Sequence, residues 1–328
     1  MQKLLTIVVP VYKVEDYINK CLDSLIVSSE MMEKLEVIIV NDGTPDRSAE
    51  LSREYVNKYP HTFRQIDKEN GGHGSAWNVG LKEATGKYIK FLDSDDWFSN
   101  LETLICDLEN NDADVVLNPF VKEFANDGKS VTVDTPIKTQ GPTAIDGSFW
   151  GQAKERFNGI NFWSGTYKAS ILKPLYPLFA ERTMFDDYII TWAPLVYGRT
   201  CITLDYPVYH YLIGRDGQSM SMAQQRRGAV SYTKCFTHYE TVRSRIKEDN
   251  VPSNLLKMID EAIAGYASYV FSYMVFLPYK ESEQWTGYLW KKYLSGLPHK
   301  TKQQKRYSLL PFLLFYTLEH LRSIKNRR

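Results

Sequence analysis

Three carboxylates stand within four residues in the segment Asp93-Ser94-Asp95-Asp96. They directly follow an apolar run, so they cannot all be ionised cheaply unless water or a cation compensates their charge. Carboxylate oxygens suit hard cations such as Mg²⁺ or Mn²⁺, which typically bridge one or two protein carboxylates and the phosphates of a substrate. The alternative is a solvated turn that leads into a helix, with Ser94 or Asp96 as its N-cap.

A second segment with chemical potential is Asn70-Gly71-Gly72-His73-Gly74, whose glycines let a ligand approach the backbone closely. It is not the dinucleotide-binding fingerprint, because no GxGxxG opens the first predicted helix. The stretch from Gly80 to Lys87 is not a P-loop either, since five residues separate its glycines where four are needed. We interpret that stretch as a helix that ends at a glycine and is followed by a strand.

The elements that position these residues follow from the hydrophobic pattern. Continuous apolar runs predict strands, and apolar residues at helical spacing predict helices between those strands. Asp46 is placed to cap one of the helices. The predicted strands are Leu4 to Val9, Leu35 to Val40, Phe63 to Ile66 and Tyr88 to Leu92, and the predicted helices are Glu15 to Val27, Asp46 to Lys58 and Ser75 to Ala84. This alternation predicts an α/β fold with a parallel sheet. Ligands of such sheets bind beyond the carboxyl ends of the strands, where Asn41-Asp42 and the acidic segment stand.

Five motifs in the first 100 residues resemble those of the family 2 inverting glycosyltransferases, of the type that serves bacterial polysaccharide biosynthesis. In chain order they are Val8-Val9-Pro10-Val11-Tyr12, Val40-Asn41-Asp42-Gly43, Asn70-Gly71-Gly72 through Ala76, Asn78 and Gly80, Gly86-Lys87-Tyr88-Ile89, and Phe91-Leu92-Asp93-Ser94-Asp95-Asp96. Each motif alone is weak, but the order and spacing of all five make the resemblance specific. It weakens to isolated motifs through about residue 221 and is absent beyond. The resemblance implies a GT-A fold, which is Rossmann-like, with a mostly parallel central sheet flanked by helices.

The resemblance also implies a nucleoside-diphosphate sugar as donor, most commonly a UDP-sugar. Pro10 and Tyr12 would lie against the nucleoside, and Asp42 would accept a hydrogen bond from the base. Asn70 and Gly71 would belong to the same donor site. Asp93 would lie near the ribose, and Asp95 would bind a metal, Mn²⁺ or Mg²⁺, at the diphosphate. The chain departs from many relatives at Trp77, where they have an arginine, and so lacks a cation that we expect near the nucleotide pocket.

An inverting transfer needs a base that takes a proton from the acceptor hydroxyl as the diphosphate leaves. The pair Asp186-Asp187, in an apolar setting, resembles the Glu-Asp pair of the family, and its second member, Asp187, is then the catalytic base. The alternative is a helix N-terminus that carries favourable carboxylates.

Three further residues each allow two interpretations. His210, in a strand beside Tyr209 and Tyr211, is either an additional metal ligand or a histidine satisfied by protein partners. Arg215 is either a diphosphate partner or a solvated loop arginine. Trp163 is either a platform for the sugar acceptor or a core residue.

The composition narrows the setting. The 328 residues carry a formal net charge of +1, which argues against a nucleic-acid-binding protein. The four cysteines lie far apart, as fits a reducing compartment, and no signal peptide or window of about 20 apolar residues is present. The sequence therefore predicts a cytoplasmic protein.

We expect a GT-A domain over residues 1–220, with a nucleotide-sugar-binding half (1–96) and an acceptor-side half (97–220), and a helical C-terminal extension over 221–328. Residues 299–328 hold eight Lys or Arg and one acid, Glu319, around the apolar stretch 309–318. Such a segment, over 300–328, either lies peripherally on the anionic inner face of a membrane or forms a docked helix with a solvated tail.

These expectations combine into a metal-dependent glycosyltransferase of the hexosyltransferase type. It would move a sugar from a UDP-sugar to a hydroxyl of a glycan or a lipid-linked glycan, as in exopolysaccharide assembly. One alternative is a catalytically inactive sugar-nucleotide-binding or scaffold protein. Another is a sugar-1-phosphate nucleotidyltransferase, which would need a Gly-rich basic loop after the first strand, where Val11-Tyr12-Lys13 offers none.

Overall fold

The computed structural model describes residues 3–135, 137–146, 161–214, 228–297 and 300–325. The chain forms two compact units, of which the first comprises residues 1–218 and 246–259 and the second comprises 219–245 and 260–328. The segment 246–259, which we expected in the C-terminal extension, thus belongs to the first unit. Its place there is supported by a guanidinium nitrogen of Arg199, which donates to the carbonyl of Asn250 at 3.2 Å.

The first unit is built on an eight-stranded sheet with the strand order β3-β2-β1-β4-β10-β6-β11-β9. The first four of these strands are parallel, as predicted: β1 (Leu5–Val11), β2 (Leu35–Asn41), β3 (Phe63–Asp67) and β4 (Tyr88–Phe91). All residues of β1 and β2 are buried, which explains why their sequences are almost continuously apolar.

The register of these strands brings their carboxyl ends to one edge of the sheet. Val11 pairs with Asn41, and Val8 pairs with Phe91. The residues that follow β1, β2 and β4 therefore emerge next to one another at this edge. They include Tyr12, Asp42 and Asp93.

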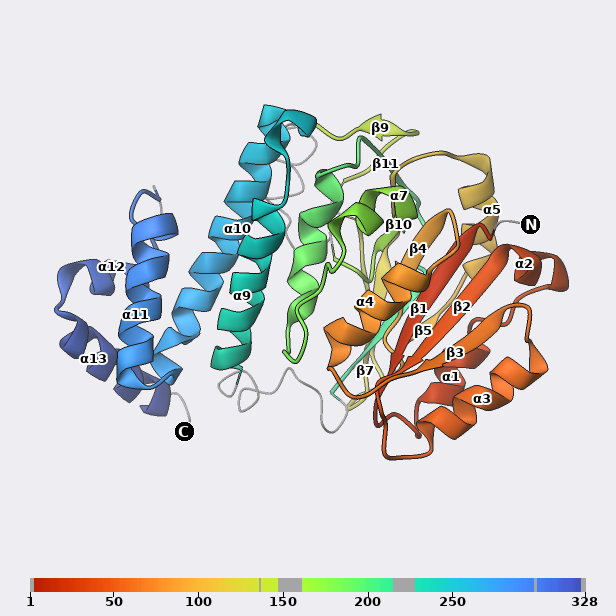
Figure 1. The fold of residues 1–328 in the computed structure, drawn as a ribbon, viewed down its shortest axis with the longest axis horizontal. Helices are drawn as coiled ribbons and strands as arrows, with labels where there is room; N and C mark the ends of the chain where they lie inside the picture. Colours follow the sequence, from red (N-terminus) through yellow and green to blue (C-terminus); the bar gives the residue numbers. More distant parts are fainter. Residues whose placement is uncertain (1–2, 136, 147–160, 215–227, 298–299, 326–328) are drawn as a thin grey trace. The chain divides into compact units, whose positions relative to one another are not determined.

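Helices between the strands cover the sheet. They are α1 (Ile18–Asp23), α2 (Ser29–Lys34), α3 (Ser48–Lys58), α4 (His73–Glu83) and α5 (Leu101–Asn110). α4 runs alongside β1 in Figure 1, with its N-terminal end toward the carboxyl edge of the strands. α1 is shorter than the predicted helix, and α2 was not predicted. Asp46 does serve the start of α3, where its carboxylate accepts from the Ser48 N–H at 3.1 Å.

The rest of the first unit extends this sheet and adds a second one. The eight-stranded sheet continues through β10 (Gly165–Lys168), β6 (Val115–Leu117), β11 (Thr200–Thr203) and β9 (Thr143–Ala144). The second sheet has the order β5-β12-β7-β8 and consists of β5 (Trp97–Phe98), β12 (Tyr209–Ile213), β7 (Phe120–Phe124) and β8 (Ser130–Val133). Short helical segments follow β10: α7 (Ala169–Leu172), η1 (Lys173–Leu175), η2 (Asp186–Thr191) and η3 (Ala193–Leu195). β12 pairs with β5, which directly follows the acidic segment.

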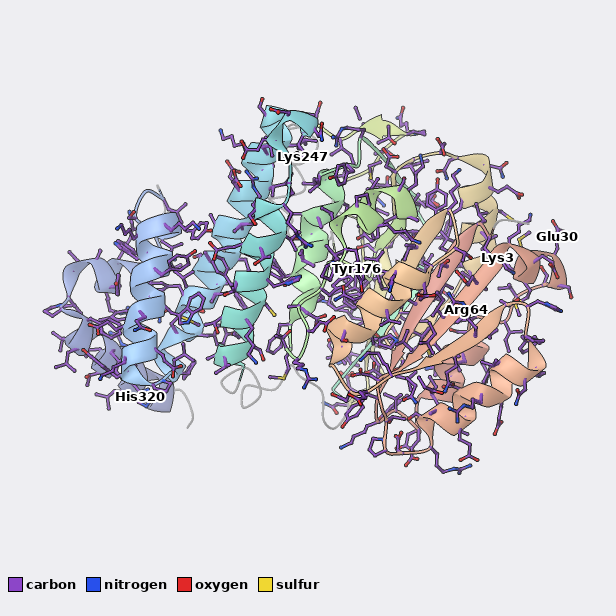
Figure 2. The ribbon with its side chains drawn as sticks, in the orientation of Figure 1. Lys3, Glu30, Arg64, Tyr176, Lys247 and His320 are labelled. Atoms are coloured by element: carbon purple, nitrogen blue, oxygen red, sulfur yellow. The ribbon has the colours of Figure 1, made fainter. Side chains whose placement is uncertain are left out.

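The described part of the second unit is helical, as expected of the C-terminal extension. Its elements are α9 (Ala229–Ser244), η5 (Met274–Phe276), α11 (Tyr279–Leu289), η6 (Trp290–Leu294), α12 (Lys302–Leu309) and α13 (Phe312–Lys325). α10 (Ser253–Tyr273), which η4 (Glu248–Asn250) precedes, begins in the first unit and continues in the second. His320, labelled on α13 in Figure 2, stacks on Tyr316 with 5.7 Å between ring centroids. None of the described helices combines the length and hydropathy that crossing a membrane requires.

Candidate active site

The acidic segment lies in the turn between β4 and β5. Carboxylate oxygens of Asp93, Asp95 and Asp96 come within 4.8 Å of one another, so the three residues form a group that can hold a metal ion. Oxygen-only ligands fit Mg²⁺ or Mn²⁺. The described residues thus have the donor set that the sequence predicted at this turn.

Asp96 has a structural role that separates it from the other two. Its carboxylate accepts from the Tyr209 hydroxyl at 2.6 Å and from the Leu212 N–H at 2.8 Å, and the residue is buried. Burial, followed by the charges of Asp95 and Asp93, raises the pKa of Asp96 well above its ordinary value. The same Tyr209 oxygen accepts from the Asp93 N–H at 3.1 Å. Asp96 therefore ties the acidic turn to β12 instead of capping a helix.

His73, the first residue of α4, bridges two acidic segments. Its Nε2 lies 2.9 Å from an Asp93 carboxylate oxygen, and its Nδ1 lies 3.2 Å from an Asp186 carboxylate oxygen. Burial alone lowers the pKa of His73, but the charges of Asp186 and Asp93 outweigh that effect and hold the pKa well above its ordinary value. The acidic turn and the predicted base segment thus share one site, although they are far apart in sequence.

The residues just before α4 surround Asp42. Its carboxylate accepts from the N–H groups of Gly71 at 2.9 Å and Gly72 at 2.8 Å, and from the Lys68 ammonium at 2.6 Å. Gly72 has a φ of +85°, a backbone conformation that residues other than glycine rarely adopt. The Asn70 side chain donates to the Asp42 carbonyl at 3.0 Å. The Asp42 side chain is only 4% exposed, so protein donors satisfy its carboxylate and the base contact expected of Asp42 stays a prediction.

The remaining donor-site candidates follow β1. Pro10 is within the strand and buried, whereas Tyr12, just beyond it, is 43% exposed. An exposed aromatic ring at the carboxyl edge of the sheet is free to stack on a flat ligand. Arg215 lies outside the described residues.

Asp186 and Asp187 begin the 3₁₀ helix η2. Asp186 is buried against the first turn of α4, where a Cβ on Gly74 would stand 2.5 Å from its carboxylate. Phe185, just before the pair, has a φ of +66°, an uncommon value for a bulky residue that signals a constrained backbone. Burial, followed by the charge of Asp186, raises the pKa of Asp187 to about 6. A carboxylate with a pKa close to the working pH suits proton abstraction.

His210 is not part of this site. Its Nδ1 lies 2.8 Å from a Glu123 oxygen and its Nε2 lies 2.9 Å from the Ser99 hydroxyl, so both ring nitrogens already contact protein oxygens. Its ring also stacks on Trp97, with 5.4 Å between centroids. Of the two interpretations of His210, these contacts favour a histidine satisfied by protein partners over a metal ligand.

Trp77 lies in the core and does not face a nucleotide pocket. The residue is fully buried, and its ring packs within 5 Å (centroid to centroid) of Phe91, Phe162 and Phe179. Trp77, at the position where the resemblance led us to expect an arginine, is therefore a core residue. The nearest cationic group on the same helix is His73, whose ring centroid is 4.1 Å from that of Trp77.

Trp163 is half-buried and belongs to an aromatic cluster. Its ring stacks on Tyr211 with 4.5 Å between centroids and contacts Phe120 and Phe162. Beneath it, the buried Lys90 ammonium donates to the Trp163 and Gly165 carbonyls at 3.2 and 3.0 Å. These contacts account for its place in the fold, and an acceptor platform at Trp163 stays a prediction.

Comparison with known proteins identifies the family. The sequence profile described as Glycosyl transferase family 2 matches residues 6–169, which is half of the 328-residue chain. The chain belongs to glycosyl transferase family 2. It is therefore a glycosyltransferase, and the matched region includes the Gly-rich segment and the acidic turn. The match ends before Asp186 and Asp187.

Individual relatives of this family 2 glycosyltransferase extend the similarity. EpsH of Bacillus subtilis (strain 168) is 28% identical over 278 residues, covering 80% of this chain and 75% of that protein. The poly(ribitol-phosphate) beta-glucosyltransferase of Bacillus spizizenii is 28% identical over 338 residues, but the chain spans 49% of its length. Residues 1–349 of Staphylococcus aureus TarS, solved in complex with UDP-GlcNAc, share the fold with a TM-score of 0.57 at 18% identity, covering 89% of this chain and 90% of that one. The GT-A fold that the sequence predicted is confirmed.

Proposed function

We propose that this glycosyltransferase transfers a sugar from a UDP-sugar to a hydroxyl of a glycan or lipid-linked glycan, with inversion at the anomeric carbon and with a divalent metal. The observation that carries the proposal is the His73 bridge, which joins an acidic turn that can hold a cation to the segment of Asp187, whose pKa is raised to about 6. An inverting transfer needs these two parts on opposite sides of one sugar carbon.

In this mechanism the donor lies along the carboxyl edge of the sheet. Tyr12 and Asp42 hold the nucleoside, Asp93 holds the ribose, and Asn70 and Gly71 shape the loop beneath them. Asp187 accepts the proton of the acceptor hydroxyl as its oxygen attacks the anomeric carbon and the bond to the diphosphate breaks. Asp186 stays bound to His73 and keeps Asp187 oriented.

The carboxylates of the acidic turn fit a divalent metal, Mn²⁺ or Mg²⁺, because they offer oxygen ligands within 4.8 Å of one another. We assign Asp95 as the metal ligand. A bound metal would neutralise the negative charge that develops on the leaving diphosphate.

The donor and acceptor classes are drawn from the comparisons. TarS was solved with UDP-GlcNAc, and the relative from Bacillus spizizenii is described as acting on poly(ribitol-phosphate). We infer a UDP-sugar donor from the first and a polymeric or lipid-linked acceptor, as in polysaccharide biosynthesis, from the second. Trp163 remains our candidate for the acceptor platform.

The C-terminal helices add a membrane partner to the proposal. Leu314 and Leu321 share one face of α13, and Leu313 lies on the side next to it. All three are solvent-exposed, as is Leu309 at the end of α12, at 47%, 58%, 63% and 80% respectively. Exposed cations accompany them at Lys302, Lys305 and Arg322. Apolar side chains with surrounding cations fit the interface of an anionic leaflet, which would bring the enzyme close to a lipid-linked acceptor.

The proposal is tested with a panel of nucleotide sugars. The purified protein is first screened by thermal shift against UDP- and GDP-sugars with and without Mn²⁺, since a ligand that binds the native state raises the melting temperature. Sugars that bind are then assayed for nucleotide release with candidate acceptors, and the anomeric configuration of the product is read by NMR. We expect a UDP-sugar to bind with Mn²⁺ and to give an inverted product. Binding without turnover on any acceptor would favour a sugar-nucleotide-binding protein, and a retained configuration would overturn the inverting mechanism.

A further inference from the structure

The two ring nitrogens of His73 face different halves of the site. Nε2 meets Asp93 at the end of β4, and Nδ1 meets Asp186 at the start of η2, 20 and 113 residues away in sequence. Each ring nitrogen thus lies within hydrogen-bonding distance of a different carboxylate, at 2.9 Å for Nε2 and 3.2 Å for Nδ1. The two carboxylates are thereby held at a fixed separation by one rigid ring.

The imidazole itself is held in a defined orientation. His73 is the first residue of α4, and its ring lies against that of Trp77 one turn further along, at an interplanar angle of 54°. Trp77 is fully buried. The ring of His73 is therefore supported from the core side while its nitrogens point to the two carboxylates.

The far partner of the bridge is packed just as tightly. A Cβ on Gly74 would stand 2.2 Å from the Ala180 carbonyl oxygen and 2.5 Å from an Asp186 carboxylate oxygen, so only glycine lets Asp186 reach α4. The backbone at Phe185 is held at a φ of +66°. A backbone conformation of this kind persists only where the surrounding residues impose it. Here the surrounding residues therefore set the direction in which the Asp187 side chain points.

We propose that His73 is a positioning residue that couples the donor half of the site to the base: by contacting Asp93 and Asp186 together, it fixes Asp187 relative to the acidic turn. This inference rests on the proposed function, because the coupling acts on rate only if Asp187 takes a proton while a donor is bound at that turn. Without the imidazole, two carboxylates would face each other and separate, carrying Asp187 away from the donor. A displacement of about 1 Å costs on the order of 100-fold in rate.

The experiment is a double-mutant cycle on turnover. Circular dichroism and melting curves first show which variants fold. The effect of His73→Asn on kcat is then measured in three backgrounds: the otherwise unchanged protein, the Asp186→Asn variant and the Asp93→Asn variant. His61→Asn, an exposed histidine of the same unit, is the matched control. We expect His73→Asn to lower kcat 10- to 100-fold in the unchanged background and less than about threefold in either aspartate variant. His61→Asn should leave kcat unchanged.

Effects of His73→Asn that are equal in all three backgrounds would overturn the coupling, as would an unchanged kcat in His73→Asn. If Asp186→Asn does not fold, the cycle with Asp93→Asn decides alone. If no nucleotide sugar is turned over, the proposed function fails, and the bridge is tested by NMR on protein labelled with ¹⁵N-histidine. A change of the Nε2 shift of His73 in Asp93→Asn and of its Nδ1 shift in Asp186→Asn supports the bridge; ring nitrogen shifts that stay the same in both variants contradict it.

Discussion

The hydroxyl of Tyr209 joins two members of the acidic turn, donating to the Asp96 carboxylate at 2.6 Å and accepting from the Asp93 N–H at 3.1 Å. One side chain of β12 thus fixes both the buried end of the turn and the backbone of the residue that faces the donor site. We infer that the shape of the turn is set from β12 before any ligand binds.

Tyr209→Phe removes this link and should destabilise the protein. The buried Asp96 carboxylate would lose a hydrogen-bond donor, which costs about 1–3 kcal/mol in the free energy of unfolding. Urea denaturation measures the loss, with Tyr12→Phe as the control, because the Tyr12 ring is 43% exposed. Equal stability of the two variants would show that the hydroxyl of Tyr209 contributes nothing to the turn.

Asp187→Asn should abolish transfer while the protein stays folded. The amide cannot take the proton of the acceptor hydroxyl, and the loss of a general base lowers rates by about 100- to 10,000-fold. Turnover and the melting temperature are measured together, and Asp205→Asn, at an exposed aspartate of the same unit, serves as the matched control. Wild-type turnover in Asp187→Asn would remove this residue as the base.

The rate should depend on pH through the same carboxyl. Its pKa is raised to about 6, and only the ionised form can accept a proton, so kcat should rise as the pH increases through about 6 and then level off. A pH–rate profile at saturating donor, with melting curves at each pH to exclude acid unfolding, provides the measurement. A profile that is flat down to pH 4.5 would contradict the raised pKa.

Removal of the metal should stop both donor binding and turnover. We expect EDTA to abolish activity and Mn²⁺ or Mg²⁺ to restore it, because the leaving diphosphate needs a counter-charge. In Asp95→Asn, a UDP-sugar with Mn²⁺ should no longer raise the melting temperature as it does in wild type. Full activity in EDTA-treated protein would exclude metal dependence, and Asp205→Asn controls for a general loss of negative charge.

The exposed leucines of α13 should bind anionic membranes. We expect the protein to sediment with vesicles of phosphatidylcholine and phosphatidylglycerol, more weakly in high salt, and not with phosphatidylcholine alone. The double substitution Leu313→Ser and Leu314→Ser should weaken binding on the order of tenfold or more, because apolar area no longer enters the interface. Val131→Ser, at an exposed valine of the first unit, is the control. Equal sedimentation of the two variants would contradict a membrane role for α13.

Strands β1, β2 and β4 were predictable because they are buried on both faces. Continuous apolar runs such as Leu35 to Val40 leave little doubt about a strand, and parallel strands bring their following polar residues to one edge. Asp42 and the acidic turn were found in this way. Residues 101–215 have short strands such as β6 and β9, whose two or three residues are too few to show a period.

The contacts that complete the site were not predictable from local pattern. His73 was visible in the Gly-rich segment, but its partner Asp186 is 113 residues away, and so is Tyr209 from Asp96. The partners of His210, Glu123 and Ser99, are 87 and 111 residues away in sequence. The local sequence around His210 therefore could not distinguish a metal ligand from a histidine with protein partners. These contacts depend on the pairing of β12 with β5 and β7 and on the approach of η2 to α4, which no short motif encodes.

The gathering of carboxylates around His73 also bears on the order in which ligands enter. Asp93, Asp95, Asp96, Asp186 and Asp187 bring five acidic side chains to one site, and a nucleoside diphosphate would add further negative charge. A bare donor would be repelled from such a site, whereas a donor already chelated to a dication would be attracted to it. We therefore expect an ordered kinetic scheme, in which the metal–nucleotide complex is the true first substrate and the acceptor follows.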